Sequence, residues 1–271
     1  MRLNILGTGH GTATECYNTC FTISNGVEHF LVDAGGGNGI LKQLKSSKIE
    51  IENIKNIFVS HIHMDHLLGV LWIIRIFARK FYKKELIEPV KIYGNDEVIS
   101  ALNKICEIVI PKDFLFLLND KIKFIEVKTN DRVKILDFDV EFIDLSAKKV
   151  KQFGFVIKKD DVNLFTFIGD EVCSANTEKY LNNTKWLFAD AYMAGEEAER
   201  HNPIERHHHS TVKYVAEMSE RLNVENLVLS HTIDNDLKNR KEKFTNDAKK
   251  YFKGNIFVPD DLEIIEIEEE L

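Results

Sequence analysis

The chain has 271 residues, enough for one large domain or two small ones, and its 44% hydrophobic and 29% charged residues are ordinary for a folded globular protein. The 43 acidic residues outnumber the 36 basic ones, and the resulting formal charge of -7 argues against a general coat protein for nucleic acid. No apolar stretch approaches the roughly 20 residues that a membrane span requires.

The cysteines and the first residues indicate a reducing compartment. Cys16, Cys20, Cys106 and Cys173 contain no CxxC pair. The start, MRLNILGTGHG, meets glycine before the apolar core of a secretory signal could form. We therefore expect a cytoplasmic protein.

The first third of the chain alternates strand and helix patterns. Short apolar runs predict strands, and an apolar face that repeats every three to four residues predicts helices. The last of these helices opens on acidic residues, which suit the positive end of its dipole. The predicted strands are 2–8, 20–24, 28–35, 56–60 and 91–95, and the predicted helices are 40–46, 70–81 and 95–110.

The middle of the chain is rich in strand patterns separated by short polar turns, which is typical of an antiparallel sheet. The alternating pattern then returns. Two similar halves predict an α/β (α+β) fold in one domain over residues 1–271, with both sheets buried between outer helical layers. The acidic end, 266–271, is expected to be a solvated tail. The strands are 123–127, 133–138, 140–145, 153–158, 163–170, 186–192, 226–231 and 262–267, with helices at 211–222 and, after the 226–231 strand, in a charged stretch.

The heptapeptide SHIHMDH comes directly after a predicted buried strand. His61 and His63, two positions apart, are expected to project to one side while Ile62 faces the core. Asp65 and His66 follow at the turn into the next helix. His and Asp are suitable ligands for a divalent ion such as zinc, and the carboxyl end of a buried strand is where α/β folds place their sites. The sequence therefore favours a metal site over a surface loop that is histidine-rich by chance.

The HxHxDH pattern resembles the signature of the metallo-β-lactamase superfamily of metal-dependent hydrolases, and the resemblance extends through the whole chain. It implies a four-layer αβ/βα sandwich with two zinc ions per chain, or manganese or iron in their place. It also implies that Asp33 in LVDAG supports the metal loop, that Asp170 in FIGDE bridges the metals, and that His231 in LVLSH is the late histidine ligand. Each of these stands at the end of an apolar strand run, so the pattern and the local structure agree.

Within the superfamily the chain is most similar to ribonuclease Z and its relatives, through LGTG, DHLLG and HST followed by an amphipathic helix. This likeness implies that His209 gives a proton to the leaving group and that Asp190 in FADAY orients His209. Ser210 and Thr211 are expected to cap the helix that follows them. For the neighbouring histidines, 207–208, a solvated or supporting role is expected.

One ligand of the superfamily pattern is missing. The superfamily usually supplies a third histidine to the first metal from the region between the halves, whereas this chain has none between His66 and His201. Three protein ligands plus a water still form a normal catalytic zinc shell. We expect a weaker first site, helped by Asp144, with Lys148 able to hold a substrate phosphate. The expected ligands are His61, His63 and Asp170 for the first metal, and Asp65, His66, His231 and Asp170 for the second.

The resemblance also bears on the substrate. Ribonuclease Z enzymes commonly carry a long arm that grips tRNA, and the corresponding interval here, 152–169, has only hairpin length. We therefore expect hydrolysis of a phosphodiester, RNA or smaller, by a metal-activated water that Asp65 orients. Two alternatives stay open: a lactone or another ester as the substrate of the same metals, and a non-catalytic metal-binding protein.

Two surface features are each predicted with an alternative. The helix at 70–81 could supply a homodimer surface, or it could be core. A basic patch could bind RNA, although a solvated face is the simpler account of its long side chains. The patch consists of Arg75, Arg79, Lys80, Lys83 and Lys84.

Overall fold

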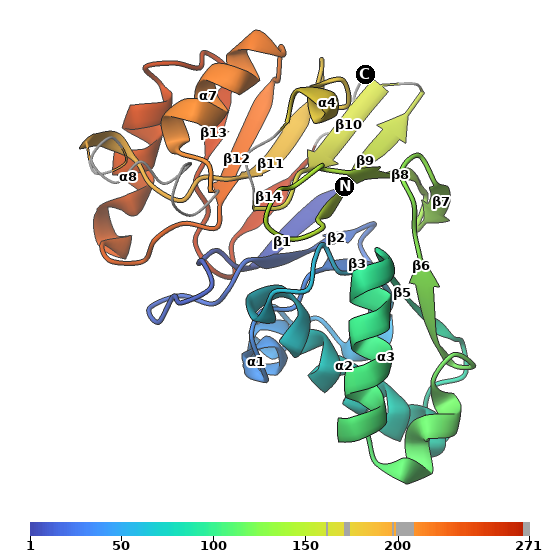
Figure 1. Ribbon diagram of the computed structural model, residues 1–271. Helices are drawn as coiled ribbons and strands as arrows, with labels where there is room; N and C mark the ends of the chain where they lie inside the picture. Colours follow the sequence, from blue (N-terminus) through green and yellow to red (C-terminus); the bar gives the residue numbers. More distant parts are fainter. Residues whose placement is uncertain (161, 171–173, 197, 199–208, 268–271) are drawn as a thin grey trace. The chain divides into compact units, whose positions relative to one another are not determined.

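The computed structural model describes residues 1–160, 162–170, 174–196, 198 and 209–267 (Figure 1). The expected roles of His207 and His208, and most of the expected acidic tail, lie outside these residues. The chain divides into two compact units, each with one seven-stranded sheet. Unit 1 comprises Met1–Gly7, Tyr17–Val127 and Asp261–Leu271, and unit 2 comprises Thr8–Cys16 and Lys128–Asp260.

Unit 1 is a mixed sheet with the strand order β14-β1-β2-β3-β4-β5-β6. The pairs from β14 to β3 are antiparallel and those from β3 to β6 are parallel. The helices α1, α2 and α3 lie together on one face of this sheet (Figure 1). Because β3 and β4 are parallel neighbours, the residues that follow them, Asp33 and Ser60, meet at one edge. The elements are β1 (Arg2–Gly7), β2 (Cys20–Ser24), β3 (His29–Val32), α1 (Gly39–Ser46), η1 (Ile51–Asn53), β4 (Ile54–Phe58), α2 (Met64–Tyr82), β5 (Val90–Gly94), α3 (Asp96–Val109), η2 (Lys112–Leu117), β6 (Ile122–Glu126) and β14 (Ile264–Glu266).

Helix α2 lies very close to the loop that follows β3. The Gly69 amide donates to the Gly35 carbonyl over 2.8 Å, and the Ala34 amide donates to the His66 carbonyl over 3.0 Å. A Cβ on Gly69 would stand 1.8 Å from the Ala34 carbonyl oxygen, so only glycine permits this approach. The first turn of α2 is thereby fixed against the loop that begins with Asp33.

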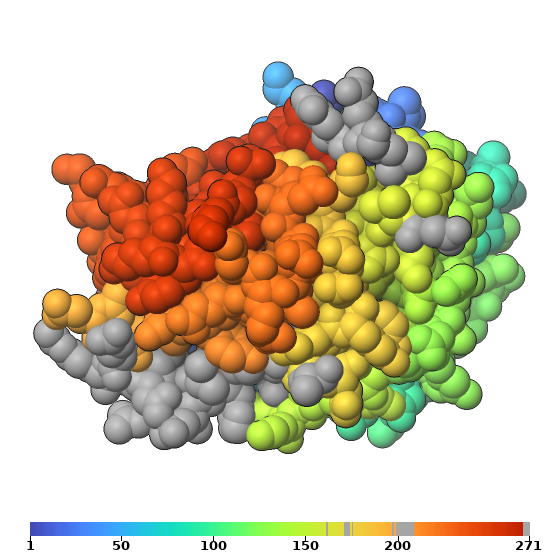
Figure 2. Space-filling model, turned by 90° about the horizontal axis from the view of Figure 1, so that it is seen from above, coloured from blue at the N-terminus to red at the C-terminus, as the bar shows by residue number. Residues whose placement is uncertain are grey.

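Unit 2 has the strand order β13-β12-β11-β10-β9-β8-β7. The pairs from β13 to β10 are parallel and those from β10 to β7 are antiparallel. In Figure 2 the orange and red atoms of the segment that holds α7 and α8 form a continuous outer surface of this unit. The elements are β7 (Arg132–Ile135), β8 (Phe138–Asp144), β9 (Phe153–Lys159), β10 (Val162–Phe167), α4 (Ala175–Glu178), β11 (Trp186–Asp190), α7 (Val212–Arg221), β12 (Asn226–Ser230), α8 (Leu237–Ala248) and β13 (Asn255–Phe257).

Each unit has its own apolar core between its sheet and its helices. The face of α2 that could have supplied a homodimer surface, including Val70, Ile74 and Phe77, is fully buried in the core of unit 1. The core of unit 2 gathers side chains from α7, α8 and the strands beneath them, such as Val215 and Leu229. Among the described residues, no helix combines the length and the apolar character needed to cross a bilayer.

Two mixed sheets with their own helices confirm the predicted α/β class, but part of the predicted pairing is wrong. The strand expected at 123–127 was assigned to an antiparallel sheet, whereas β6 pairs parallel with β5 in unit 1. The strand expected at 133–138 is split by a turn at Leu136, which has a φ of 54°, so that its two halves belong to β7 and β8. An alternation of polar and apolar residues predicts a half-buried strand but does not indicate which strand it pairs with.

The helix boundaries also differ in two instructive places. Helix α2 begins at Met64, six residues before the predicted start, and therefore includes the end of the SHIHMDH segment. The cap of α7 is Thr211, whose side chain accepts from the Tyr214 amide over 3.1 Å. The expected capping role of Ser210 is wrong, because the N-cap position belongs to Thr211, while the Ser210 amide donates to Asp190 over 2.7 Å.

Candidate metal centre

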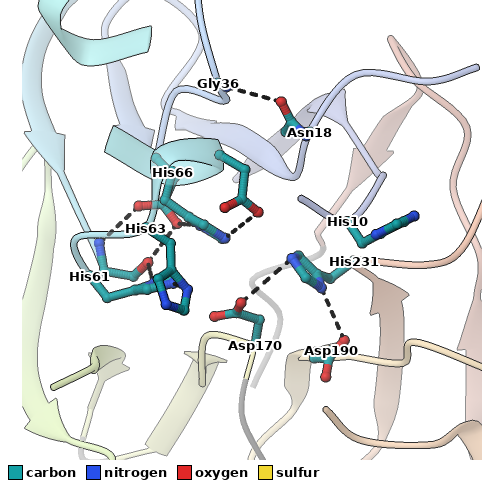
Figure 3. Close-up of polar contacts among 12 residues, drawn as sticks. His10, Asn18, Gly36, His61, His63, His66, Asp170, Asp190 and His231 are labelled. Atoms are coloured by element: carbon teal, nitrogen blue, oxygen red, sulfur yellow. Dashed lines mark hydrogen bonds and ion pairs between the residues drawn. The ribbon is translucent and has the colours of Figure 1, made fainter. Parts of the chain in front are cut away.

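The SHIHMDH segment leaves the sheet earlier than expected. Strand β4 ends at Phe58, so His61 and His63 lie in the loop before α2 rather than on a pleated strand. Ile62 is 38% exposed, and the prediction that it faces the core is wrong because the two-residue alternation stops with the strand. His61 and His66 are nevertheless buried, and His63 is partly buried (Figure 3).

Asp33 holds this loop in place through the hydrogen bonds of its side chain. Its backbone has a φ of 55°, the left-handed conformation that is uncommon outside glycine. Its carboxylate accepts from the Ser60 amide, the Ser60 hydroxyl and Nδ1 of His66, each over 2.8 Å. The side chain is 1% exposed, so these bonds are made away from bulk water. Asp33 thus contacts both Ser60 and His66, while its role in supporting a metal remains a prediction.

The same bonds fix which ring nitrogens carry protons. Nδ1 of His66 faces a carboxylate and therefore carries the proton of the neutral ring, which leaves Nε2 unprotonated. The Ser60 hydroxyl donates its hydrogen to Asp33. Its oxygen therefore accepts from Nδ1 of His61, over 2.9 Å. His61 therefore also presents an unprotonated Nε2. Ser60 was not predicted as part of the site, although its place between strand and histidine could have suggested it.

The predicted ligand atoms of unit 1 occur as two close pairs. Nε2 of His61 lies 2.9 Å from Nδ1 of His63, and Nε2 of His66 lies 3.2 Å from a carboxylate oxygen of Asp65. Ligands about 2.0–2.1 Å from one zinc ion stand roughly 2.9–3.4 Å apart at bond angles between roughly 90° and 110°. Two nitrogen lone pairs at this separation repel each other unless a proton or a cation lies between them. The spacing and the donor types fit a borderline divalent metal.

Unit 2 holds the remaining predicted ligands. Asp170 follows β10 and His231 follows β12, and both are 3% exposed. Nε2 of His231 lies 3.5 Å from Asp170 Oδ2, while its Nδ1 faces Asp190 Oδ1 at 3.4 Å (Figure 3). His231, like Asp33, has a φ of 55°. Strained backbone of this kind concentrates at functional sites, where the surrounding contacts hold it.

His209 shares the carboxylate of Asp190. Its Nδ1 donates to the Asp170 carbonyl over 2.8 Å and faces Asp190 Oδ2 at 3.3 Å. Burial alone would lower the pKa of His209, but the charge and hydrogen bond of Asp190 outweigh it and the net pKa is raised. Ligand atoms of Asp170, His209 and His231 lie within 4.8 Å of one another, so this set could also hold a cation.

Two further residues of unit 2, Gln152 and Asp144, bear on the predicted site. Gln152 is 1% exposed, and its side-chain oxygen accepts from the Asp170 amide over 3.4 Å, which fixes the loop after β10. No sequence pattern marked it, since a single glutamine carries no ligand signal. Asp144, expected to help the first metal, accepts instead from the Ser146 amide over 2.8 Å. It belongs to none of the ligand clusters formed by the described residues.

Several known proteins share the fold and part of the sequence. Ribonuclease Z of Borreliella afzelii is 32% identical over 143 residues, which cover 46% of this chain and 42% of that protein. Ribonuclease Z of Ligilactobacillus salivarius is 23% identical over 308 residues, covering 96% of this chain and 95% of that protein. The chain thus spans less than half the length of the Borreliella relative that it matches.

Solved structures agree on the architecture. The metallo-beta-lactamase fold protein YhfI from Bacillus subtilis has a TM-score of 0.79 at 15% identity, with 97% of this chain and 98% of that chain covered. The short form of human tRNase Z has a TM-score of 0.75 at 18% identity, covering 99% of this chain and 100% of that chain. The chain therefore has the metallo-β-lactamase fold, and the predicted likeness to the ribonuclease Z-like branch is confirmed. A family model described as Anti-Pycsar protein Apyc1 matches residues 1–250, and the chain belongs to that family.

Proposed function

We propose that the chain is a metal-dependent hydrolase of small phosphodiesters. The observation that carries this proposal is the set of ligand pairs: two in unit 1, and Asp170 with His231 in unit 2, each at a separation near that of two ligands on one ion. We infer that these residues hold two divalent metal ions per chain, with zinc as the first candidate and manganese or iron as others. Ions of this kind supply a nucleophilic hydroxide near neutral pH and stabilise charge on phosphoryl oxygens.

The chain's own residues would share the remaining work. Asp65 would accept a hydrogen bond from the attacking water and orient it. A bond forms between the water oxygen and phosphorus while the bond to the leaving oxygen breaks. His209 would give its proton to that leaving oxygen, and its raised pKa keeps the proton available toward neutral pH. Asp190 would hold His209 in position for this transfer.

The first metal is proposed to be the weaker one. The chain offers it His61, His63 and Asp170, since no histidine lies between His66 and His201. Three protein ligands are sufficient for a catalytic zinc ion, but each missing ligand weakens retention. Protein purified without chelator is expected to keep the second metal more firmly than the first during dialysis.

A small substrate is favoured over tRNA by two features. The interval that would hold the tRNA-gripping arm is the plain hairpin of β9 and β10, in which Lys159 pairs with Val162. The formal charge of -7 does not assist binding to a polyanion. The names ribonuclease Z and tRNase Z among similar proteins make RNA the substrate to test against.

The test is a substrate panel on metal-loaded protein. We expect hydrolysis of bis(p-nitrophenyl) phosphate and of linear or cyclic nucleotide diesters, with little cleavage of precursor tRNA. Preferential opening of a homoserine lactone would instead assign the site to ester hydrolysis. Metal content below one ion per chain, with no response to added zinc or manganese in either assay, would identify a non-catalytic protein. His231→Ala serves as the inactive control, because it removes a proposed ligand.

A further inference from the structure

His10 lies at the end of a row of rings that includes the proposed acid. It stands edge-on to Tyr192, with ring centres 5.3 Å apart and planes at 86°. Tyr192 stacks on His209 at 5.0 Å, and His209 stacks on His231 at 4.9 Å. All four residues belong to unit 2. Neither the HxHxDH pattern nor the proposed ligand sets assign a role to His10.

The loop that carries His10 is firmly held. Asp234 Oδ2 accepts from the amides of Thr14 and Glu15 over 2.5 and 2.8 Å. The His10 amide donates to the Thr232 carbonyl over 3.2 Å, immediately after His231. Backbone fixed on both sides of an imidazole is typical of a positioned group rather than of an idle loop side chain.

The beginning of the same loop is fixed by a buried guanidinium. Arg240 is 3% exposed and donates to the hydroxyls of Thr8 and Thr232 over 2.9 and 3.0 Å. It also donates to the Pro259 carbonyl over 2.8 Å. The loop and the strand end that bears His231 are therefore tied to one rigid side chain, which keeps His10 in register with the proposed site.

The local bonds also decide which nitrogen of His10 is the donor. The Thr12 amide donates to its Nδ1 over 3.4 Å, so Nδ1 is the acceptor and Nε2 carries the hydrogen of the neutral ring. Nε2 itself faces Asp234 Oδ1 at 3.6 Å. Burial and then repulsion from His231 lower the pKa of His10, and they outweigh the charge of Asp234, which raises it. The side chain is 15% exposed, so a ligand can reach it.

We propose that His10 is a substrate-contacting residue: its Nε2–H, which lies 3.6 Å from Asp234 Oδ1, would be shared in a hydrogen bond with an oxygen on the leaving alcohol of the diester. The ring is directed away from Asp170 in Figure 3, so it would meet a part of the substrate remote from phosphorus. Its place beyond Tyr192 and His209 puts it on the side of the proposed proton donor. A sugar-derived leaving group carries such an additional oxygen, and a nitrophenolate carries none next to the scissile bond. This inference rests on the proposed function and names the leaving-group chemistry that the site selects.

The test compares two diesters and three variants. His10→Ala is expected to lower kcat/KM for a dinucleoside monophosphate about tenfold, the effect of one lost hydrogen bond, and to change kcat/KM for bis(p-nitrophenyl) phosphate less than about twofold. His10→Gln, whose amide nitrogen reaches near the position of Nε2, should recover most of the loss, whereas His10→Asn should not. The matched control is His29→Ala, a partly buried histidine of unit 1 that contacts Thr22, which should leave both substrates unaffected.

Equal losses on both diesters, or no loss on either, would overturn the role of His10. A binding measurement keeps this outcome separate from failure of the proposed function. Calorimetry would use a dinucleotide analogue in which a methylene group replaces the leaving oxygen. An affinity about tenfold weaker for His10→Ala than for the wild type supports the contact even where no turnover is seen. Equal affinities of the two proteins refute it.

Discussion

Replacement of Asp190 by Asn tests how the unit 2 ligands are held. The carboxylate faces nitrogen on both sides: Oδ2 accepts from the Ser210 amide over 2.7 Å and faces His209, and Oδ1 faces Nδ1 of His231 at 3.4 Å. An amide has the same shape but can accept on one side only. With its oxygen kept toward Ser210, its NH₂ group would face His231 and force Nδ1 to accept.

The substitution would leave His231 in the tautomer that cannot bind a metal through Nε2. Its proton would move to Nε2, the atom that faces Asp170, and a protonated nitrogen cannot bind a metal. We expect metal affinity or activity to fall about 10- to 100-fold, the usual effect of losing the partner of a ligating histidine. Two charge-assisted hydrogen bonds become neutral ones or are lost, which should cost about 2 kcal/mol of unfolding free energy.

The pH dependence of kcat/KM distinguishes this effect from a purely structural defect. Asp190 raises the pKa of His209 against the effect of burial, so the substitution removes the raising contribution and the pKa falls. Because the proposed acid must be protonated, the alkaline limb of kcat/KM should move to lower pH in the variant.

The matched control for Asp190→Asn is Asp247→Asn, a second buried carboxylate of unit 2. It accepts from the Gly195 amide over 2.7 Å and from Lys250 over 2.9 Å. It should lose comparable stability and keep the wild-type metal content and pH profile. Metal binding by competition with a chelating dye, activity on bis(p-nitrophenyl) phosphate and chemical denaturation measure the three effects. An Asp190→Asn protein that loses stability like the control but keeps its metal affinity and alkaline limb would refute the tautomer argument.

Three further outcomes are expected. His63→Ala should lower the metal content measured by elemental analysis from two ions per chain toward one, and an unchanged content would exclude it as a ligand. Gly69→Ala drives a methyl group against the Ala34 carbonyl at 1.8 Å, so thermal unfolding should reveal a loss of about 3 kcal/mol or failure to fold; a wild-type melting temperature would contradict the close approach of α2. The two terminal guanidinium nitrogens of Arg221 donate to the Glu178 carboxylate, each over 2.7 Å, and lower the pKa of Glu178 from 4.5. This pair therefore stabilises the fold above pH 4.5, and the stabilisation is lost as the pH falls through the pKa of the folded state. Arg221→Met should therefore lower the unfolding free energy at pH 7 by no more than about 1 kcal/mol, with the difference vanishing in acid.

The parts that the sequence predicted well are those where a side-chain pattern follows a strand. Asp33, Asp170 and His231, which the resemblance to the superfamily indicated, stand after β3, β10 and β12. Local patterns also gave the helices at 40–46 and 95–110 to within one residue at each end. The ligand roles themselves stay predictions until metal is measured.

The errors and omissions share one physical origin, which is that local sequence does not specify distant partners. The β6 strand alternates like its antiparallel neighbours, yet it extends the parallel part of unit 1. Ile62 follows a strand that ends two residues earlier than its composition indicated. The Gln152 side chain accepts from the Asp170 amide, and His10 lies beside Tyr192. Only the fold creates these two contacts.

Both units use a buried carboxylate to orient the histidines that we propose as metal ligands or as the acid. In unit 1 a single buried carboxylate, Asp33, holds His66 directly and His61 through Ser60. In unit 2 a single buried carboxylate, Asp190, faces both His209 and His231. Each carboxylate faces Nδ1 of its histidines, so Nε2 of His66 and His231 would be available to a metal ion and Nε2 of His209 to the leaving group, and less ordering would remain to oppose binding. Both partners of each contact belong to the same unit, so the orientation of these histidines follows from the fold of that unit alone. We therefore expect the missing histidine of the first set to weaken metal binding without disordering the other proposed ligands.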